Sequence, residues 1–156
     1  MKTIIFYATK YGAAREIAQR IAKLMDNAET CDLKQDKIPA LDGFDCVIIG
    51  GSLYAGMIRK EAKTFAAQNT GALRDKKIGL FVSGIADSGE EKFFEDNFPA
   101  EIVQAAKAAS LLGGVFDPSK AGGFERFIMK IITKQSGYID KIDDEKIAQF
   151  AEAMKK

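Results

Sequence analysis

Hydrophobic residues recur along this chain with two different spacings. Short runs that are apolar on both faces predict buried strands, and they occupy residues 3–7, 29–33, 44–50, 77–83 and 109–115. Apolar residues that recur every three or four positions predict amphipathic helices, over residues 13–25, 58–68, 90–97, 100–107, 124–134 and 144–154. Strands therefore alternate with helices along the chain.

This alternation predicts an α/β fold, because parallel strands joined by right-handed helical crossovers bury a sheet between two helical layers. We expect a doubly wound three-layer sandwich with a five-stranded parallel sheet. With 156 residues and no repeat or linker, residues 1–156 are expected to form a single domain. Ligands of such folds bind outside the carboxyl ends of the strands, so the loops there are the candidate site.

Composition narrows the chemistry that such a site can perform. Lys and Arg number 23 against 22 Asp and Glu, which gives no reason to expect a nucleic-acid partner. Histidine and tryptophan are absent, which removes histidine-based catalysis and most zinc sites. Cys31 and Cys46 stand apart in or beside strand runs, and we expect buried free thiols. We predict no catalytic side chain and no metal, and expect a bound cofactor to supply any chemistry.

The loop after the first strand is the candidate phosphate site. Thr9, Lys10, Tyr11, Gly12, Ala13 and Ala14 lead into a helix, whose first amide groups lack partners and attract anions. The loop matches neither GxGxxG nor GxxxxGK(S/T), so dinucleotides and nucleoside triphosphates are disfavoured and a monophosphate is favoured. A turn that merely caps the helix is the alternative.

Two further loops follow strong strands and are expected at the same sheet edge. Residues 44–50 end in Gly50, and Gly51 and the segment Ser52, Leu53, Tyr54, Ala55 and Gly56 follow. The three glycines, Gly50 among them, allow a flat ligand to approach, and Tyr54 offers an aromatic face. After residues 77–82 come Ser83, Gly84, Ile85 and Asp87, which are expected to edge the same ligand. Each loop alone also suits an ordinary turn, so their convergence is what favours a ligand.

The segments Thr9-Lys10-Tyr11-Gly12 and Ile48-Ile49-Gly50-Gly51-Ser52 resemble the flavodoxin family, which binds FMN non-covalently. More narrowly, residues 9–18, 49–56 and 124–130 resemble the flavodoxin-domain, menaquinone-dependent protoporphyrinogen oxidases. The resemblance implies a flavodoxin-like fold in which Thr9, Gly12 and neighbouring backbone groups hold the FMN phosphate. It also implies that residues 52–56 and 83–87 flank the isoalloxazine ring.

The resemblance implies an FMN-dependent oxidoreductase or electron-transfer protein, with a quinone or a redox partner protein and, in the oxidase subfamily, a porphyrinogen substrate. A plain flavodoxin electron carrier is an alternative. Tyr11 and Ala14 stand where flavodoxin phosphate loops generally carry hydroxyl residues. These departures keep a second alternative open, a cofactor-free flavodoxin-like binding module.

Residues 124–134 predict a basic amphipathic helix. Its apolar stripe comprises Phe124, Phe127, Ile128, Ile131 and Ile132, and Arg126, Lys130 and Lys134 follow another face. We favour packing of the stripe on the sheet; the alternative is weak contact with an anionic membrane surface or a quinone. Only four apolar residues follow Met1-Lys2-Thr3 before polar ones return, so we expect a cytoplasmic protein, with peripheral contact at the inner face of the membrane under the alternative.

Overall fold

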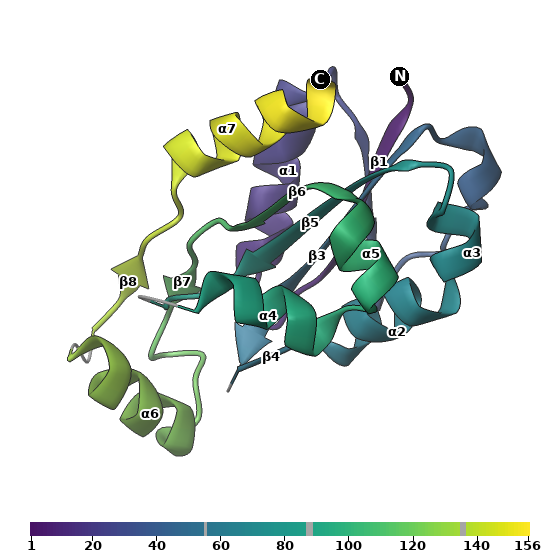
Figure 1. Cartoon of the computed structure of the whole chain (residues 1–156). Helices are drawn as coiled ribbons and strands as arrows, with labels where there is room; N and C mark the ends of the chain where they lie inside the picture. The colour runs from purple at the N-terminus through teal and green to yellow at the C-terminus, as the bar shows by residue number, and fades with distance from the viewer. Residues whose placement is uncertain (55, 87–88, 135–136) are drawn as a thin grey trace.

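The computed structural model describes residues 1–54, 56–86, 89–134 and 137–156, and Figure 1 shows the arrangement of the chain. The strands are β1 (Thr3–Ala8), β2 (Glu29–Asp32), β3 (Cys46–Tyr54), β4 (Met57–Ile58), β5 (Lys77–Ser83), β6 (Ala106–Leu111), β7 (Val115–Phe116) and β8 (Ile139–Asp140). The helices are α1 (Ala13–Leu24), α2 (Lys60–Gln68), α3 (Thr70–Leu73), α4 (Glu90–Asn97), α5 (Ala100–Ala105), α6 (Gly123–Thr133) and α7 (Asp144–Lys155), with the short 3-10 helix η1 (Leu41–Gly43).

The central sheet has the strand order β2-β1-β3-β5-β6, and every pair along this path is parallel. This confirms the predicted α/β fold with five parallel strands. The chain passes from β1 to β2 in one direction, and from β3 to β5 and β6 in the other. The winding therefore reverses between β1 and β3, where sheets of this kind open a crevice at their carboxyl edge.

Helices cover both faces of the sheet (Figure 1). Helices α1 and α7 pack on one face, and α2, α4 and α5 contribute to the core on the other. Helix α1 shows why the sequence folds in this way: Ile17, Ala18 and Ile21 recur on one side and are fully buried, whereas Glu16 and Gln19 are exposed. Each buried isoleucine contributes about 2 kcal/mol relative to an exposed one.

The third strand is longer than the sequence pattern predicts. The expected strand over residues 44–50 is β3, but β3 continues to Tyr54 because its end forms a hairpin with β4. Leu53 pairs with Ile58 and Tyr54 pairs with Met57 in antiparallel register. Strand β4 has two residues, which is too short for a hydrophobic period to be recognised. Strands β7 and β8 and helix α3 are also too short to show a hydrophobic period, and the pattern does not predict them.

The last strand of the sheet lies earlier than expected. The pattern predicts a strand over residues 109–115, whereas β6 begins directly after α5 and ends at Leu111. The chain turns at Gly113, whose φ is 78°. A Cβ atom there would overlap the carbonyl group of Lys141, so the close approach of the two backbones requires glycine.

The α6 segment, from β7 to β8, lies beside the sandwich rather than within it (Figure 1). Strands β7 and β8 pair with each other in a two-stranded antiparallel ribbon. The prediction that the apolar stripe packs on the sheet is wrong for Phe124, Phe127 and Ile131, which are 70%, 60% and 59% exposed; the side chains of Ile128 and Ile132 are outside the described part of the structure. Among the residues that the structure describes, no helix has both the length and the apolar character needed to cross a membrane.

Candidate functional site

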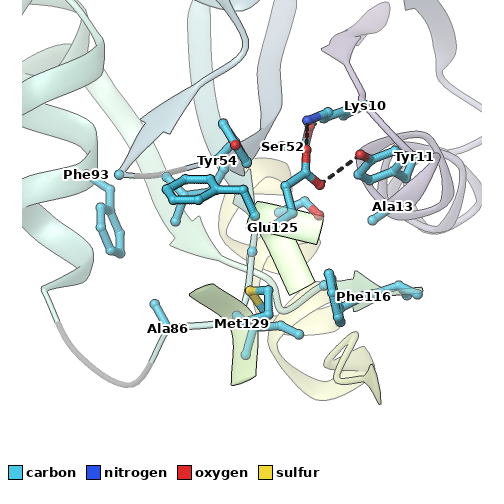
Figure 2. A pocket seen from close by; sticks show the side chains of 18 residues that line it. Lys10, Tyr11, Ala13, Ser52, Tyr54, Ala86, Phe93, Phe116, Glu125 and Met129 are labelled. Atoms are coloured by element: carbon cyan, nitrogen blue, oxygen red, sulfur yellow. Dashed lines mark hydrogen bonds and ion pairs between the residues drawn. The ribbon is translucent and has the colours of Figure 1, made fainter. Parts of the chain in front are cut away.

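A cavity of about 330 Å³ opens at the carboxyl ends of β1, β3 and β5 (Figure 2), a volume within the range of small-molecule sites. All three predicted loops line it, through Lys10, Tyr11, Ala13, Ser52, Leu53, Tyr54, Gly56, Ser83, Gly84 and Ile85. Thr9, Gly12 and Ala14 belong to the first loop but do not line the cavity. The predicted residues Ala55 and Asp87 lie outside the described residues. The structure therefore brings the three loops together.

The first loop leaves the start of α1 open. Gly12 is the N-cap residue, with φ 100°, and no side chain caps the helix. The Gly12 amide donates a hydrogen bond to Thr9 Oγ1 over 2.9 Å, so the Thr9 hydroxyl shapes the turn. The amides of Ala13, Ala14 and Arg15 precede the first helical hydrogen bond, which Glu16 donates to the Gly12 carbonyl, and they carry the positive end of the helix dipole. Ala14 is fully buried, so its methyl group belongs to the core.

The end of β3 forms the middle of the site. The Lys10 amide donates to Ser52 Oγ over 3.1 Å, which connects the first loop to β3. Tyr54 is 43% exposed, and its ring centroid lies 4.1 Å from Lys10 Nζ, a distance at which a cation is attracted to the ring face. The site thus combines a cation, a hydroxyl and an aromatic ring beside the open helix terminus.

Glycines allow backbone segments to meet beneath the cavity. A Cβ atom on Gly84 would lie 2.8 Å from Leu53 Cβ, and one on Gly114 would lie 3.0 Å from the Gly84 nitrogen. Gly50 was expected to admit a flat ligand, but it lies within β3, opposite Phe81 of β5. A Cβ atom there would overlap the Phe81 ring. The absence of a side chain at Gly50 therefore makes room for the Phe81 ring and not for a ligand.

Helix α6 contributes a carboxylate that sequence reasoning does not find. Glu125 accepts hydrogen bonds from Lys10 Nζ and from Tyr11 Oη, the latter over 2.8 Å (Figure 2). Its side chain is only 14% exposed. The contact joins residues 115 positions apart in sequence, and nothing in a pattern of spacing indicates it.

Lys10, Tyr11 and Glu125 shift one another's pKa values. Burial tends to raise the pKa of Glu125, but hydrogen bonds from Lys10 and Tyr11 outweigh it and hold this pKa below its ordinary value. The hydrogen bond to Glu125 raises the pKa of Lys10. Burial, and then the hydrogen bond to Glu125, raise the pKa of Tyr11. At neutral pH the cluster is therefore an ammonium, a carboxylate and a neutral phenol.

Ala86 of the predicted segment 83–87 also lines the cavity. The rest of the opposite wall is largely apolar and was not predicted; its residues come from α4, from β7 and the turn before it, and from α6: Phe93, Gly114, Val115, Phe116, Phe124 and Met129. The residues of α6 reach the cavity because the β7–β8 ribbon places this helix beside the sheet edge (Figure 1). The hydrophobic pattern marks Phe124 as apolar, but it does not say which surface the residue faces.

The cysteines lie away from this cavity. Cys31 and Cys46 are free and buried, as expected. Burial raises the pKa of the Cys31 thiol to about 11, and burial also raises that of Cys46. Both are therefore neutral thiols of low reactivity at neutral pH.

Residues 4–143 match a family model described as a flavodoxin domain. The flavodoxin of Helicobacter pylori (strain ATCC 700392 / 26695) is 29% identical over 159 aligned positions, covering 97% of this chain and 94% of that protein. Protoporphyrinogen IX dehydrogenase (quinone) of Escherichia coli K12 is 24% identical, covering 88% of this chain and 81% of that protein.

Solved structures give the same fold. A short-chain flavodoxin associated with a non-canonical PDU bacterial microcompartment superposes with a TM-score of 0.58 at 18% identity, covering 99% of this chain and 97% of that one. Oxidised flavodoxin 1 from Bacillus cereus has a TM-score of 0.57 at 15% identity, with the same coverage. These similarities confirm the flavodoxin-like fold expected from the sequence.

Proposed function

Because this chain belongs to the flavodoxin domain family, we propose that it binds FMN in the cavity at the carboxyl ends of β1, β3 and β5 and transfers electrons through it. The observation that carries this proposal is the uncapped start of α1, which opens beside the cavity where the winding of the sheet reverses. Bound FMN would supply one- or two-electron transfer, and the chain would bind and orient it.

The residues present fit a phosphate monoester. The amides of Ala13, Ala14 and Arg15 can donate to phosphate oxygens, and Lys10 supplies a positive charge. Tyr54 presents an exposed ring on which a flat heterocycle can stack. Tyr11 already donates its hydroxyl to Glu125, and Ala14 is buried in the core, so backbone groups and Lys10 take over the role of the usual hydroxyl residues. Each neutral hydrogen bond lost in this way costs about 1 kcal/mol.

The apolar wall supports an apolar electron acceptor. Phe93, Val115, Phe116 and Met129 line the cavity opposite the phosphate loop, and the E. coli relative is by its name a quinone-dependent dehydrogenase. We therefore propose a quinone as acceptor, with a porphyrinogen-type donor as the finer version of this function. A plain electron carrier for a redox partner protein is the second candidate, favoured by the identity to H. pylori flavodoxin.

We also place this activity in the cytoplasm. Two buried free cysteines, neither of them in a disulfide, suit a reducing compartment.

Flavin binding is tested with protein purified from cells supplied with riboflavin, by its visible spectrum and by fluorescence quenching when FMN is added to apoprotein. The double variant Thr9→Ala, Lys10→Ala should bind FMN at least about tenfold more weakly, since it loses a cation and the hydroxyl that shapes the turn. Lys63→Ala with Thr64→Ala on α2 removes the same two residue types elsewhere and should leave the affinity unchanged. Colourless protein that does not quench FMN fluorescence would establish the cofactor-free alternative.

Turnover separates the two electron-transfer candidates. FMN-loaded protein mixed with a porphyrinogen and a quinone should form the fluorescent porphyrin if it is a dehydrogenase. A plain carrier should give no porphyrin, yet should be reduced by a flavodoxin reductase and reoxidised by a partner protein.

A further inference from the structure

The outer face of α6 carries large apolar side chains that lie outside the core, and of these only Phe124 also lines the cavity. Phe124, Phe127 and Ile131 follow one another at intervals of three and four residues, so they lie on one side of the helix. All three are mostly exposed to solvent. Large apolar side chains gathered on exposed surface indicate an interaction site and not a solvated face.

The neighbouring face of the helix carries positive charge. Arg126, Lys130 and Lys134 recur every four residues and are exposed, so they follow one side of the apolar stripe. Glu125 is the only acidic residue in the α6 sequence, and it points away from this surface, toward Lys10 and Tyr11 in the cavity (Figure 2). Its charge is thus balanced inside the site, and the exposed side of the helix is apolar and cationic.

We propose that this face of α6 binds the surface of membranes that contain anionic phospholipids. Aromatic and aliphatic side chains would enter the interface, and the flanking cations would contact lipid phosphates. The helix has 11 residues, so the contact is weak and reversible on its own.

The charges of the face favour a lipid surface over a second copy of this chain. Packing the stripes of two copies against each other in a symmetric dimer would bring the neighbouring cations Arg126, Lys130 and Lys134 of the two copies close together. Juxtaposed like charges oppose such association. An anionic lipid surface instead matches both the apolar and the cationic parts of the face.

Docking in this way would place the cavity next to the lipid. Phe124 belongs to the exposed stripe and also lines the cavity, so the mouth of the cavity adjoins the proposed membrane surface. If the proposed quinone chemistry is correct, a lipid-soluble acceptor could enter the cavity from the membrane. Membrane binding itself does not depend on FMN, so the two proposals can fail separately.

The test is sedimentation of the 156-residue chain, with and without FMN, together with phosphatidylcholine vesicles that contain or lack phosphatidylglycerol. The chain has no tryptophan, so Phe127→Trp adds a single fluorophore to the face. We expect pelleting only with the anionic vesicles, a blue shift of the tryptophan emission on binding, and loss of both at high salt. Equal sedimentation with neutral vesicles, or none with anionic vesicles, overturns the proposal.

Paired variants locate the contact. Arg126→Glu with Lys130→Glu should weaken vesicle binding at least about tenfold, and Phe127→Ser with Ile131→Ser should abolish it. Lys23→Glu and Leu24→Ser, which alter an exposed cation and an exposed apolar residue at the end of α1, should leave it unchanged. Because the altered α6 residues are exposed, thermal melting should show all variants folded. Retained binding by both α6 variants, or a dimer in analytical ultracentrifugation that the same variants dissociate, would contradict a lipid-binding face.

Discussion

The sheet and the α6 segment are held in place by different kinds of interaction. In the sheet, side chains such as Phe6, Ile48 and Phe81 are completely buried between two helical layers. The α6 segment is attached by the two-residue strands β7 and β8, in which Phe116 and Ile139 are buried, and by the hydrogen bonds of Glu125 with Lys10 and Tyr11. The cavity lies between them. One wall is therefore fixed by burial between two helical layers. The position of α6 in the other wall depends on a small ribbon and a few polar contacts, so we expect that it can be altered without unfolding the protein.

The largest expected difference between the regions is in the cost of removing a phenylalanine ring. Phe6→Ala should lower the free energy of unfolding by about 3–5 kcal/mol, because it leaves a cavity against the Phe65 ring, whose centroid lies 4.3 Å away. Phe127→Ala should change it by about 0.5 kcal/mol or less, because this ring is exposed. Urea denaturation of both variants measures the two values. Similar costs would mean that the outer face of α6 is packed against the protein.

A second effect is expected where the backbone at Gly113, after the last strand of the sheet, contacts the backbone at Lys141, after β8. Gly113→Ala should destabilise the protein by about 2 kcal/mol, because a side chain at a φ of 78° is strained and the new Cβ would overlap the Lys141 carbonyl. Gly71→Ala in α3 is the matched control: its Cβ would meet no atom within 4 Å, so it should cost nothing or stabilise slightly. Thermal melting compares the two variants, and equal melting temperatures would show that the backbone contact at Gly113 tolerates a side chain.

The two regions also differ in how well the sequence predicts them. Residues 3–7 and 77–83 are predicted almost to the residue, because burial on both faces of a parallel sheet leaves an uninterrupted apolar run. The predicted loops meet at one cavity for the same reason, since parallel strands bring their carboxyl ends to one edge. The order of the strands then decides which loops become neighbours.

The α6 segment shows where such reasoning ends. The amphipathic pattern of residues 124–134 correctly predicts a helix, but amphipathicity is the same whether the apolar side faces a protein core or a lipid surface. The pairing of Glu125 with Lys10 depends on a ribbon of two-residue strands, which leave no periodic signal. Contacts set by such short elements require the three-dimensional structure.

A smaller effect is expected at the contact that joins the regions. Glu125→Gln removes the carboxylate that engages Lys10, so it should raise FMN affinity about two- to fivefold, in keeping with the modest strength of partly exposed ion pairs. Fluorescence titration of apoprotein measures this, and Glu95→Gln, an exposed residue of α4, should leave the affinity unchanged. A lower affinity in Glu125→Gln would show that this carboxylate orients the cofactor and does not compete with its phosphate.

The smallest predicted effect is a pH dependence of α6 docking. The pKa of Glu125 is lowered in the folded protein. The contribution of Glu125 to the stability of α6 docking is therefore complete above the pKa of an unfolded glutamate, about 4.3, and is lost as the pH falls through the lowered value. The pKa of Lys10 is raised. The contribution of Lys10 to the stability of α6 docking is therefore complete below the pKa of an unfolded lysine, about 10.4, and is lost as the pH rises through the raised value. The contact should therefore be constant near neutral pH.

Hydrogen exchange of the described residues 117–134, corrected for intrinsic rates, should thus show no change from pH 6 to pH 8 and faster exchange only in acid. Because Lys10 and Glu125 are partly exposed, the change should correspond to about 1 kcal/mol or less. Glu125→Gln has no carboxylate to titrate and should lack the acid step while the sheet retains its protection. An acid step that persists in this variant would mean that other groups anchor α6, and the wall of the cavity would then be less adjustable than its polar contacts indicate.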